Sequence, residues 1–255
     1  MNLYKKASSL KAYIRSFFDS VEAIDNGYYE QQESCQVPHL DFLFQFFLGR
    51  KESGVFVEIG AHDGVNCSNT WGLARRGWAG YLVEAIPEYA EKCRQNHKDH
   101  TNVIVEQIAI GAIEGEEVTF NIGGQLTTAN TELNLEYKNI SWAKSVITSS
   151  QVKVATKRLD TFLEERGIDP TFDLLVIDVE GFEAQVFSGF ELSKWVPKML
   201  IVELTDTHPD LRTNANSDAY LGQEILSNNY QIVYKDCINT VFVHNDVWKV
   251  AFSAS

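Results

Sequence analysis

From residue 54 onward, short runs of β-branched and aliphatic residues alternate with stretches of helical periodicity. This alternation is typical of parallel strands joined by crossover helices, so we expect an open α/β sheet. The expected strands are residues 55–59, 80–83, 103–108, 174–177 and 199–203. The expected helices are residues 66–76, 87–96, 159–166, 182–190 and 217–228.

Three further segments complete the expected organisation. Runs at 230–235 and 240–244 lie close together and predict a terminal antiparallel hairpin. Residues 121–150 are polar and lack strong periodicity, which is typical of a lid or binding loop. The chain thus divides into an N-terminal helical arm, residues 1–50, and one domain, residues 51–255, with an insertion at about 121–150.

The arm itself contains two expected helices. Apolar residues spaced four and three apart over residues 3–24 predict one stripe on a helix, and residues 38–48 predict a second helix that ends before Gly49. A stripe of this kind more often packs on its own domain, and pairing of two chains into a homodimer is the alternative.

Composition narrows the partners and the compartment. The formal net charge of −13 argues against broad binding to nucleic acid or to anionic lipid, which draws on Lys and Arg. The four cysteines include no Cys-x-x-Cys pair, so neither a zinc knuckle nor a disulfide framework is indicated. Charged residues interrupt the N-terminal segment where a signal peptide is apolar, and no run approaches the ~18 apolar residues of a membrane span. We therefore expect a cytoplasmic protein.

The segment VFVEIGAHDGVNCSNT, residues 55–70, carries the strongest local signal. A hydrophobic strand runs into a turn that contains Gly60 and Gly64, and a helix is expected to follow. Glycines let the backbone turn sharply and approach a ligand, and a helix N-terminus presents unpaired amides there. The pattern predicts a cofactor loop, although a plain strand-to-helix turn explains two glycines equally well.

An acid at the end of the second strand supports the cofactor interpretation. Glu84 follows Gly60 by twenty-four residues, and a carboxylate there can accept hydrogen bonds from the hydroxyls of an adenosine ribose. A surface acid after a strand is the plainer alternative. Glu58 and Asp63 in the loop would repel a pyrophosphate, whereas they suit the ammonium and sulfonium of S-adenosylmethionine. An NAD-dependent oxidoreductase is therefore the less favoured alternative.

Beyond these residues, the sequence resembles the FkbM family of S-adenosylmethionine-dependent methyltransferases. The matching words run in order across residues 54–205: VFVEIGAHDG, SNT, GWAGYLVEAIPEYAEKCRQN, QIAIG, RLDTFL and DLLVIDVEGFEAQVFSGF. The resemblance implies a Rossmann-like class I methyltransferase fold, with a mostly parallel seven-stranded sheet whose C-terminal hairpin supplies one antiparallel strand. Where the family often has a lysine in the fourth strand, this chain has Val176.

The resemblance also implies a set of cofactor-binding residues. Its first motif and the SNT word supply Glu58, Gly60, His62, Asp63, Gly64 and Asn69. Glu84 becomes the ribose-binding acid, and the residues around the adenine are Ala85, Ile86, Gln107 and Ala109. Asp178 is placed beside the methionine end of the cofactor.

The acids after the fourth and fifth strands are the candidate catalytic residues. Asp178 and Glu203 end neighbouring strands, and ligands of open α/β sheets bind beyond such ends. Glu180 can point the same way as Asp178 because side chains alternate. Glu180 and Glu183 also suit the N-terminus of the next helix, and Glu183 is expected to be such a helix acid.

Transfer of a methyl group to a hydroxyl requires an aligned acceptor and removal of its proton. His208 could act as the general base, or it could join Asp178, Glu203 and Asp206 in a site for a divalent ion such as Mg²⁺. A lone histidine in a loop is more often simply solvated. The sequence leaves both the base and the metal open.

These residues predict an S-adenosylmethionine-dependent methyltransferase that methylates a hydroxyl of a sugar, glycan or other small metabolite, with Asp178 near the reacting centre. Tyr137 and Trp142 in the insertion are candidates for stacking on a sugar ring, and core filling is the alternative for Trp142. A second hypothesis is a binding protein that keeps the fold and cofactor, transfers nothing and partners a glycan-modifying enzyme.

Overall fold

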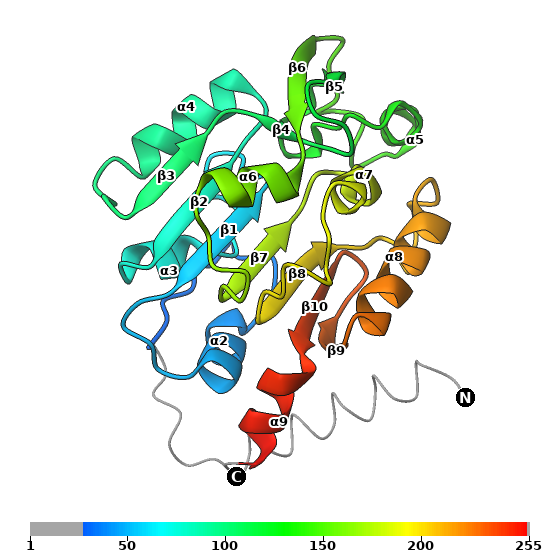
Figure 1. Cartoon of the computed structure of the whole chain (residues 1–255). Coiled ribbons are helices and arrows are strands. Elements are labelled where there is room, and N and C mark those ends of the chain that lie inside the picture. The colour runs from blue at the N-terminus through cyan, green and yellow to red at the C-terminus, as the bar shows by residue number, and fades with distance from the viewer. Residues whose placement is uncertain (1–27, 254–255) are drawn as a thin grey trace.

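The computed structural model describes residues 28–253, and its centre is a seven-stranded sheet of order β3-β2-β1-β7-β8-β10-β9 (Figure 1). The strands are β1 Val55–Ile59, β2 Ala79–Val83, β3 Val103–Glu106, β7 Leu174–Ile177, β8 Met199–Glu203, β9 Tyr230–Lys235 and β10 Asn239–His244. Neighbours pair in parallel except at β10, which is antiparallel to both β8 and β9. The expected methyltransferase-like sheet with one antiparallel strand is confirmed.

Helices cover both faces of this sheet. They are α2 Leu40–Leu48, α3 Trp71–Arg75, α4 Pro87–Asn96, α6 Leu159–Glu165, α7 Glu183–Ser188, α8 Ala215–Ser227 and α9 Asn245–Ser253. Successive strand residues point to opposite faces, so Val57 joins one hydrophobic core with α6, α7 and α8. Its neighbour Phe56 joins the other core with α2, α3 and α9. Burial on both faces explains why the central strands are continuous apolar runs.

A second, smaller sheet forms after β3. It has the order β4-β6-β5, with β4 Ala109–Ile110, β5 Glu117–Asn121 and β6 Gln151–Lys157. The sequence analysis extended the third strand to residue 108 and missed β5 and β6. In Figure 1 this sheet lies beyond the carboxyl ends of β1 and β7, so it covers one end of the central sheet.

The insertion between β5 and β6 contains a helix, α5 Thr131–Asn139, that its polar sequence did not reveal. The side chain of Asn130 caps this helix by accepting hydrogen bonds from the amides of Glu132 and Leu133. Leu133 and Tyr137 then pack with Leu211 in a small core of their own. The insertion is therefore an ordered cover over the end of the sheet.

The expected helix at 66–76 begins only at Trp71. The carboxylate of Asp63 holds the amides of Val65 and Asn66, and Cys67 has a left-handed φ of 61°, so these residues form turns. The N-terminal stripe at residues 3–24 lies outside the described residues, so pairing through it stays a prediction. Among residues 28–253, no helix has the length and apolar character needed to cross a membrane.

Candidate functional site

A cavity of about 250 Å³ lies at the carboxyl ends of β1, β2, β7 and β8. Residues from each of these strand ends line it, and Tyr137 and Trp142 line it from the insertion. This is the place where open α/β sheets bind ligands, because helices cover the two faces and leave the strand ends accessible. Of the sequence-predicted site residues, those that line it are Glu58, Gly60, His62, Glu84, Ala85, Ile86, Ala109, Asp178, Glu180, Glu203 and His208.

Gly60 brings the first loop against the end of β7. Its φ is 90°, and a Cβ added there would clash with the carbonyl oxygen of Asp178. The amides of Gly60 and Ala61 both donate to the carbonyl of Val83, at 2.9 and 3.1 Å. Glycine is therefore required here because two backbone segments approach each other closely. The sequence analysis had instead expected Gly60 to allow a close approach to a ligand.

The two acids of the first loop differ in their surroundings. Glu58 is buried, and its Oε2 accepts a 2.6 Å hydrogen bond from the hydroxyl of Thr70. Burial raises the pKa of Glu58 to about 7. Burial also acts to raise the pKa of Asp63, but hydrogen bonds from Val65 and Asn66 outweigh it and lower that pKa. Glu58 lines the cavity, whereas the carboxylate of Asp63 is turned toward the amides of its own loop.

Four predicted cofactor-binding residues lie outside the cavity wall, and their roles stay predictions. Asp63, Gly64, Asn69 and Gln107 do not line the cavity formed by the described residues. The carbonyl of Gly64 lies 2.8 Å from Nε2 of His97, and the side chain of Asn69 donates to Gln36. The spacing placed Asp63, Gly64 and Asn69 in or near the first loop, but the directions of the Asp63 and Asn69 side chains depend on the turns.

Glu84 occupies the end of β2 and faces the cavity. Its carboxylate accepts hydrogen bonds from the amides of His62 and Ile86, at 2.8 and 2.7 Å. Burial raises its pKa to about 7. Each carboxylate oxygen keeps a second lone pair that can accept a further hydrogen bond. Glu84 can therefore bind a ligand hydroxyl while it also holds the loop.

Beside Glu84, the cavity wall is apolar. Ile86, Ala109 and Phe120 belong to one hydrophobic cluster, and all three line the cavity. Phe120 comes from β5, a strand that the sequence analysis missed. An apolar slot next to a buried carboxylate suits a flat aromatic group that carries a hydroxylated ring, as an adenosine does.

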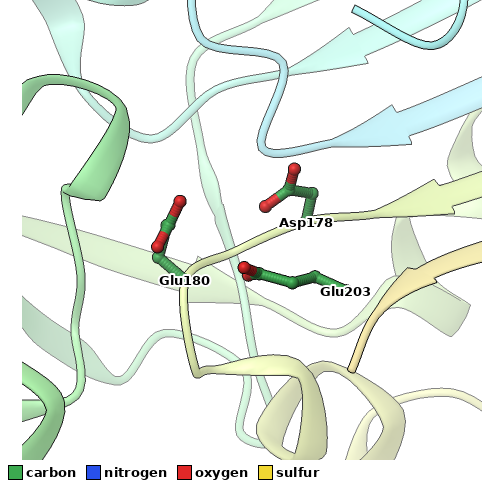
Figure 2. A group of neighbouring side chains, drawn as sticks. All are labelled: Asp178, Glu180 and Glu203. Carbon is green, nitrogen blue, oxygen red and sulfur yellow. The ribbon is translucent and has the colours of Figure 1, made fainter. Parts of the chain in front are cut away.

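Three acids converge in the part of the cavity at the ends of β7 and β8. Asp178 at the end of β7, Glu180 in the loop after it, and Glu203 at the end of β8 point toward one another (Figure 2). One oxygen of each lies within 4.8 Å of the others. We call these three residues the carboxylate cluster. Burial raises the pKa of each, and for Glu180 and Glu203 the neighbouring carboxylates raise it further.

The backbone after β7 explains how Glu180 joins the cluster. Glu180 has a φ of 52° and Gly181 a φ of 84°, so two successive residues are left-handed and the chain turns sharply. Glu183 accepts from the amides of Val179 and Gly181 and thereby caps this turn, in agreement with its expected role as a helix acid. Strict strand alternation does not extend past Asp178.

The insertion is anchored to the same turn. The hydroxyl of Tyr137 donates to Oε2 of Glu180 at 2.5 Å, and Thr128 donates to the carbonyl of Glu180 at 2.5 Å. Asn130 donates to the carbonyl of Gly181 at 3.2 Å. Tyr137 is buried, whereas Trp142 is 47% exposed. The insertion therefore closes the cavity with Tyr137 and leaves the ring of Trp142 accessible.

His208 also reaches the cavity, and its hydrogen bonds define its tautomer. Nδ1 accepts from the amides of Asp210 and Leu211, both at 3.1 Å, so a neutral ring carries its proton on Nε2. The ring is then a hydrogen-bond donor toward a ligand, which disfavours the expected role as a general base. Asp206, expected beside it in a metal site, instead pairs with Lys235 at 2.5 Å.

Gln36 is a site residue that the sequence analysis missed. It lies before α2, lines the cavity, and its side chain hydrogen-bonds Asp178. No motif or periodicity marks this position, because a glutamine in a polar connection has no local signature. Only the packing of the N-terminal segment against the strand ends brings it to Asp178.

A comparison with known families gives one match. The family model for the methyltransferase FkbM domain matches residues 58–232. No match was found among curated proteins.

Solved structures of similar fold are distant in sequence. An O-methyltransferase from Bacillus cereus in complex with SAH has 12% identity and a TM-score of 0.45, covering 92% of this chain and 99% of that one. A precorrin-6y C5,15-methyltransferase from Geobacter metallireducens has 9% identity and a TM-score of 0.42, with 86% and 94% covered. A SAM-dependent methyltransferase from Aquifex aeolicus has 11% identity and a TM-score of 0.41, with 80% and 87% covered.

Proposed function

The chain belongs to the FkbM methyltransferase family and is an S-adenosylmethionine-dependent methyltransferase, and on that premise we propose that it methylates a hydroxyl group of a sugar, glycan or other small metabolite. One observation carries the proposal. The cavity has an apolar slot beside Glu84, and at the ends of β7 and β8 it has the carboxylate cluster, in which Glu203 is buried and the other two acids are half-buried. A cationic cofactor and a hydroxyl-bearing acceptor both suit such a cavity.

The residues around Glu84 fit the adenosine part of the cofactor. Glu84 would accept hydrogen bonds from the ribose hydroxyls, and Ile86, Ala109 and Phe120 would enclose the adenine. In their ionised form, the carboxylate cluster and Glu58 would favour the positively charged methionine end electrostatically. The cofactor supplies a methyl group on a sulfonium, so that the carbon–sulfur bond breaks as a carbon–oxygen bond to the acceptor forms.

The carboxylate cluster, His208 and Trp142 would act on the acceptor. As the new bond forms, the hydroxyl loses its proton, and a carboxylate of the cluster can accept it. Nε2–H of His208 would donate a hydrogen bond to another oxygen of the acceptor. The accessible ring of Trp142 would pack against a sugar ring at the mouth of the cavity. These three roles favour an acceptor with several hydroxyls.

Calorimetry and a transfer assay test this proposal. S-adenosylhomocysteine should bind the full chain, and absence of binding at millimolar ligand would reject the assigned cofactor site. Labelled methyl from S-adenosylmethionine should then be incorporated into a member of a panel of sugars, nucleotide sugars and glycans. Asp178→Asn should abolish incorporation even at S-adenosylmethionine concentrations that saturate the variant, and Asp206→Asn is the matched control.

The same assay separates the second hypothesis. A protein that binds S-adenosylhomocysteine but methylates no member of the panel or of a cell extract would support a binding protein. Incorporation that is lost in Asp178→Asn would reject that hypothesis. Incorporation into an amine in place of a hydroxyl would overturn the proposed O-methylation and leave the family assignment intact.

A further inference from the structure

The carboxylate cluster gathers three hard oxygen ligands from adjacent strand ends. Asp178 and Glu180 come from the end of β7 and the turn after it, and Glu203 comes from the end of β8. One oxygen of each lies within 4.8 Å of the others. Carboxylate oxygens at such separations are the ligands that divalent cations such as Mg²⁺, Mn²⁺ and Ca²⁺ prefer.

The protein supplies little positive charge to this cluster. Among residues 28–253, no Lys or Arg forms an ion pair with any of the three acids. Tyr137 donates to Glu180 and Gln36 donates to Asp178, which are two neutral donors. The side chains of Asp178 and Glu203 also hydrogen-bond each other, which requires a proton on one of the two carboxyl groups. Like charges held this close in a buried place repel one another strongly unless a cation or protons offset them.

A second observation singles out Glu203. This side chain is only 6% exposed, and its Oε2 is buried with no hydrogen-bond partner. A buried carboxylate oxygen without a partner carries a large desolvation cost. The side chain points toward Asp178 and Glu180 (Figure 2). A cation bound between the three acids would therefore give the unpaired oxygen an interaction partner.

We propose that Asp178, Glu180 and Glu203 form a binding site for one divalent cation. Ligand atoms on opposite sides of Mg²⁺ lie about 4 Å apart, and those on opposite sides of Ca²⁺ lie about 5 Å apart. The oxygen–oxygen separations in the cluster, all within 4.8 Å, are therefore compatible with either ion. The hydrogen bond from Tyr137 occupies Oε2 of Glu180 and leaves Oε1 for the ion. Three carboxylates fill only part of a coordination shell of six or more, so positions stay open for water or a ligand oxygen.

The site gives the proposed function a more specific form. If the acceptor binds where we place it, its hydroxyl can occupy an open position on the cation, which lowers the pKa of the bound hydroxyl. This consequence rests on the proposed function, whereas the cation site itself rests on the geometry of the three acids alone.

Electron paramagnetic resonance with Mn²⁺ and the full chain tests the site without any transfer assay. The signal of free Mn²⁺ should fall on addition of protein, with one ion bound per chain. Glu203→Gln and Glu180→Gln should each weaken Mn²⁺ binding by about tenfold or more, since each replaces a charged ligand with a neutral amide. Asp206→Asn should leave the binding unchanged, because Asp206 is paired with Lys235 outside the cluster.

Circular dichroism of each variant should show the native fold, and if one variant does not fold, the other and Asp178→Asn still decide the outcome. No Mn²⁺ binding at millimolar ion, or equal binding by Glu203→Gln and the parent chain, would overturn the site. Cofactor binding without Mn²⁺ binding would overturn the cation site and leave the proposed function. Mn²⁺ binding without cofactor binding would support the cation site and overturn the proposed function.

Discussion

Tyr137 donates a 2.5 Å hydrogen bond to Glu180 across 43 residues of sequence. One partner belongs to α5 of the insertion, and the other to the left-handed turn after β7. The bond joins the cover of the cavity to the carboxylate cluster. Because both groups are largely shielded from water, the bond is stronger than it would be at the surface.

Tyr137→Phe removes this bond and leaves the ring in place. The free energy of unfolding should fall by about 1–2 kcal/mol, because a partly buried carboxyl oxygen loses its donor. Urea denaturation measures this change. Tyr220→Phe is the control, since Tyr220 is 73% exposed and should lose almost nothing. Equal effects of the two substitutions would show that the bond contributes little.

Glu84→Ala tests the assigned ribose acid. Affinity for S-adenosylhomocysteine should fall by about 1–3 kcal/mol, because hydrogen bonds from hydroxyls to a carboxylate are lost. Calorimetry measures the affinity. Glu88→Ala, an exposed acid paired with Lys92 on the next helix, should bind normally. An unchanged affinity in Glu84→Ala would remove the assignment.

The buried acids should make the stability depend on pH. The pKa of Glu84 is raised to about 7 from an unfolded value of 4.5, so the folded protein binds more protons between these values. The contribution of Glu84 is therefore fully present below pH 4.5 and is lost as the pH rises through about 7. Its upper limit is about 3 kcal/mol.

Urea denaturation near pH 5 and pH 8 checks this sign. The decrease in the free energy of unfolding between about pH 5 and about pH 8 should be smaller in Glu84→Gln than in the parent chain, because Gln does not titrate. Part of the decrease should persist, since burial raises the pKa of Glu58 to about 7 as well. A parallel pH profile in the variant would contradict the assigned titration.

Gly60→Ala tests the contact between the first loop and β7. The new Cβ would meet the carbonyl of Asp178, so the free energy of unfolding should fall by more than about 3 kcal/mol. Gly115→Ala is the matched control, because Gly115 also has a positive φ, 75°, but has nothing within 4 Å of an added Cβ. It should cost only about 1 kcal/mol of backbone strain. Similar losses in the two variants would show that φ alone matters.

Trp142→Ala tests the mouth of the cavity. Once an acceptor is identified, its KM should rise several-fold while the affinity for S-adenosylhomocysteine stays the same, because Trp142 belongs to the insertion, whereas the assigned ribose acid Glu84 follows β2. Steady-state methyl transfer and calorimetry separate the two effects. A loss of cofactor affinity, or an unchanged KM, would contradict packing of this ring against the acceptor.

The central sheet was readable from the sequence because its signal is local. β1, β7 and β8 are buried on both faces, and their apolar runs have the predicted bounds. β6 was missed although Val152 and Val154 alternate with polar residues, since its small sheet buries little of the strand. The helix α9 was also missed. Its apolar face packs against α2, where the ring of Trp248 stacks on Phe47.

The site was readable only in part. The strand ends gave Glu84, Asp178 and Glu203, because the carboxyl ends of parallel strands meet at one edge of a sheet. The direction of Asp63, away from the cavity, depends on hydrogen bonds within its turn. Gln36 reaches Asp178 from a segment with no motif at all.

By itself, the sequence determined the family, the strands of the central sheet, and which acids stand at strand ends. These follow from residue types and periods that act over a few neighbours along the chain. Only the tertiary structure decided that Glu180 turns inward to complete the carboxylate cluster, that Tyr137 meets it, and that one oxygen of Glu203 stays unpaired. Such relationships join segments far apart in sequence, and only the packing of strands, turn and insertion at one edge of the sheet brings them together.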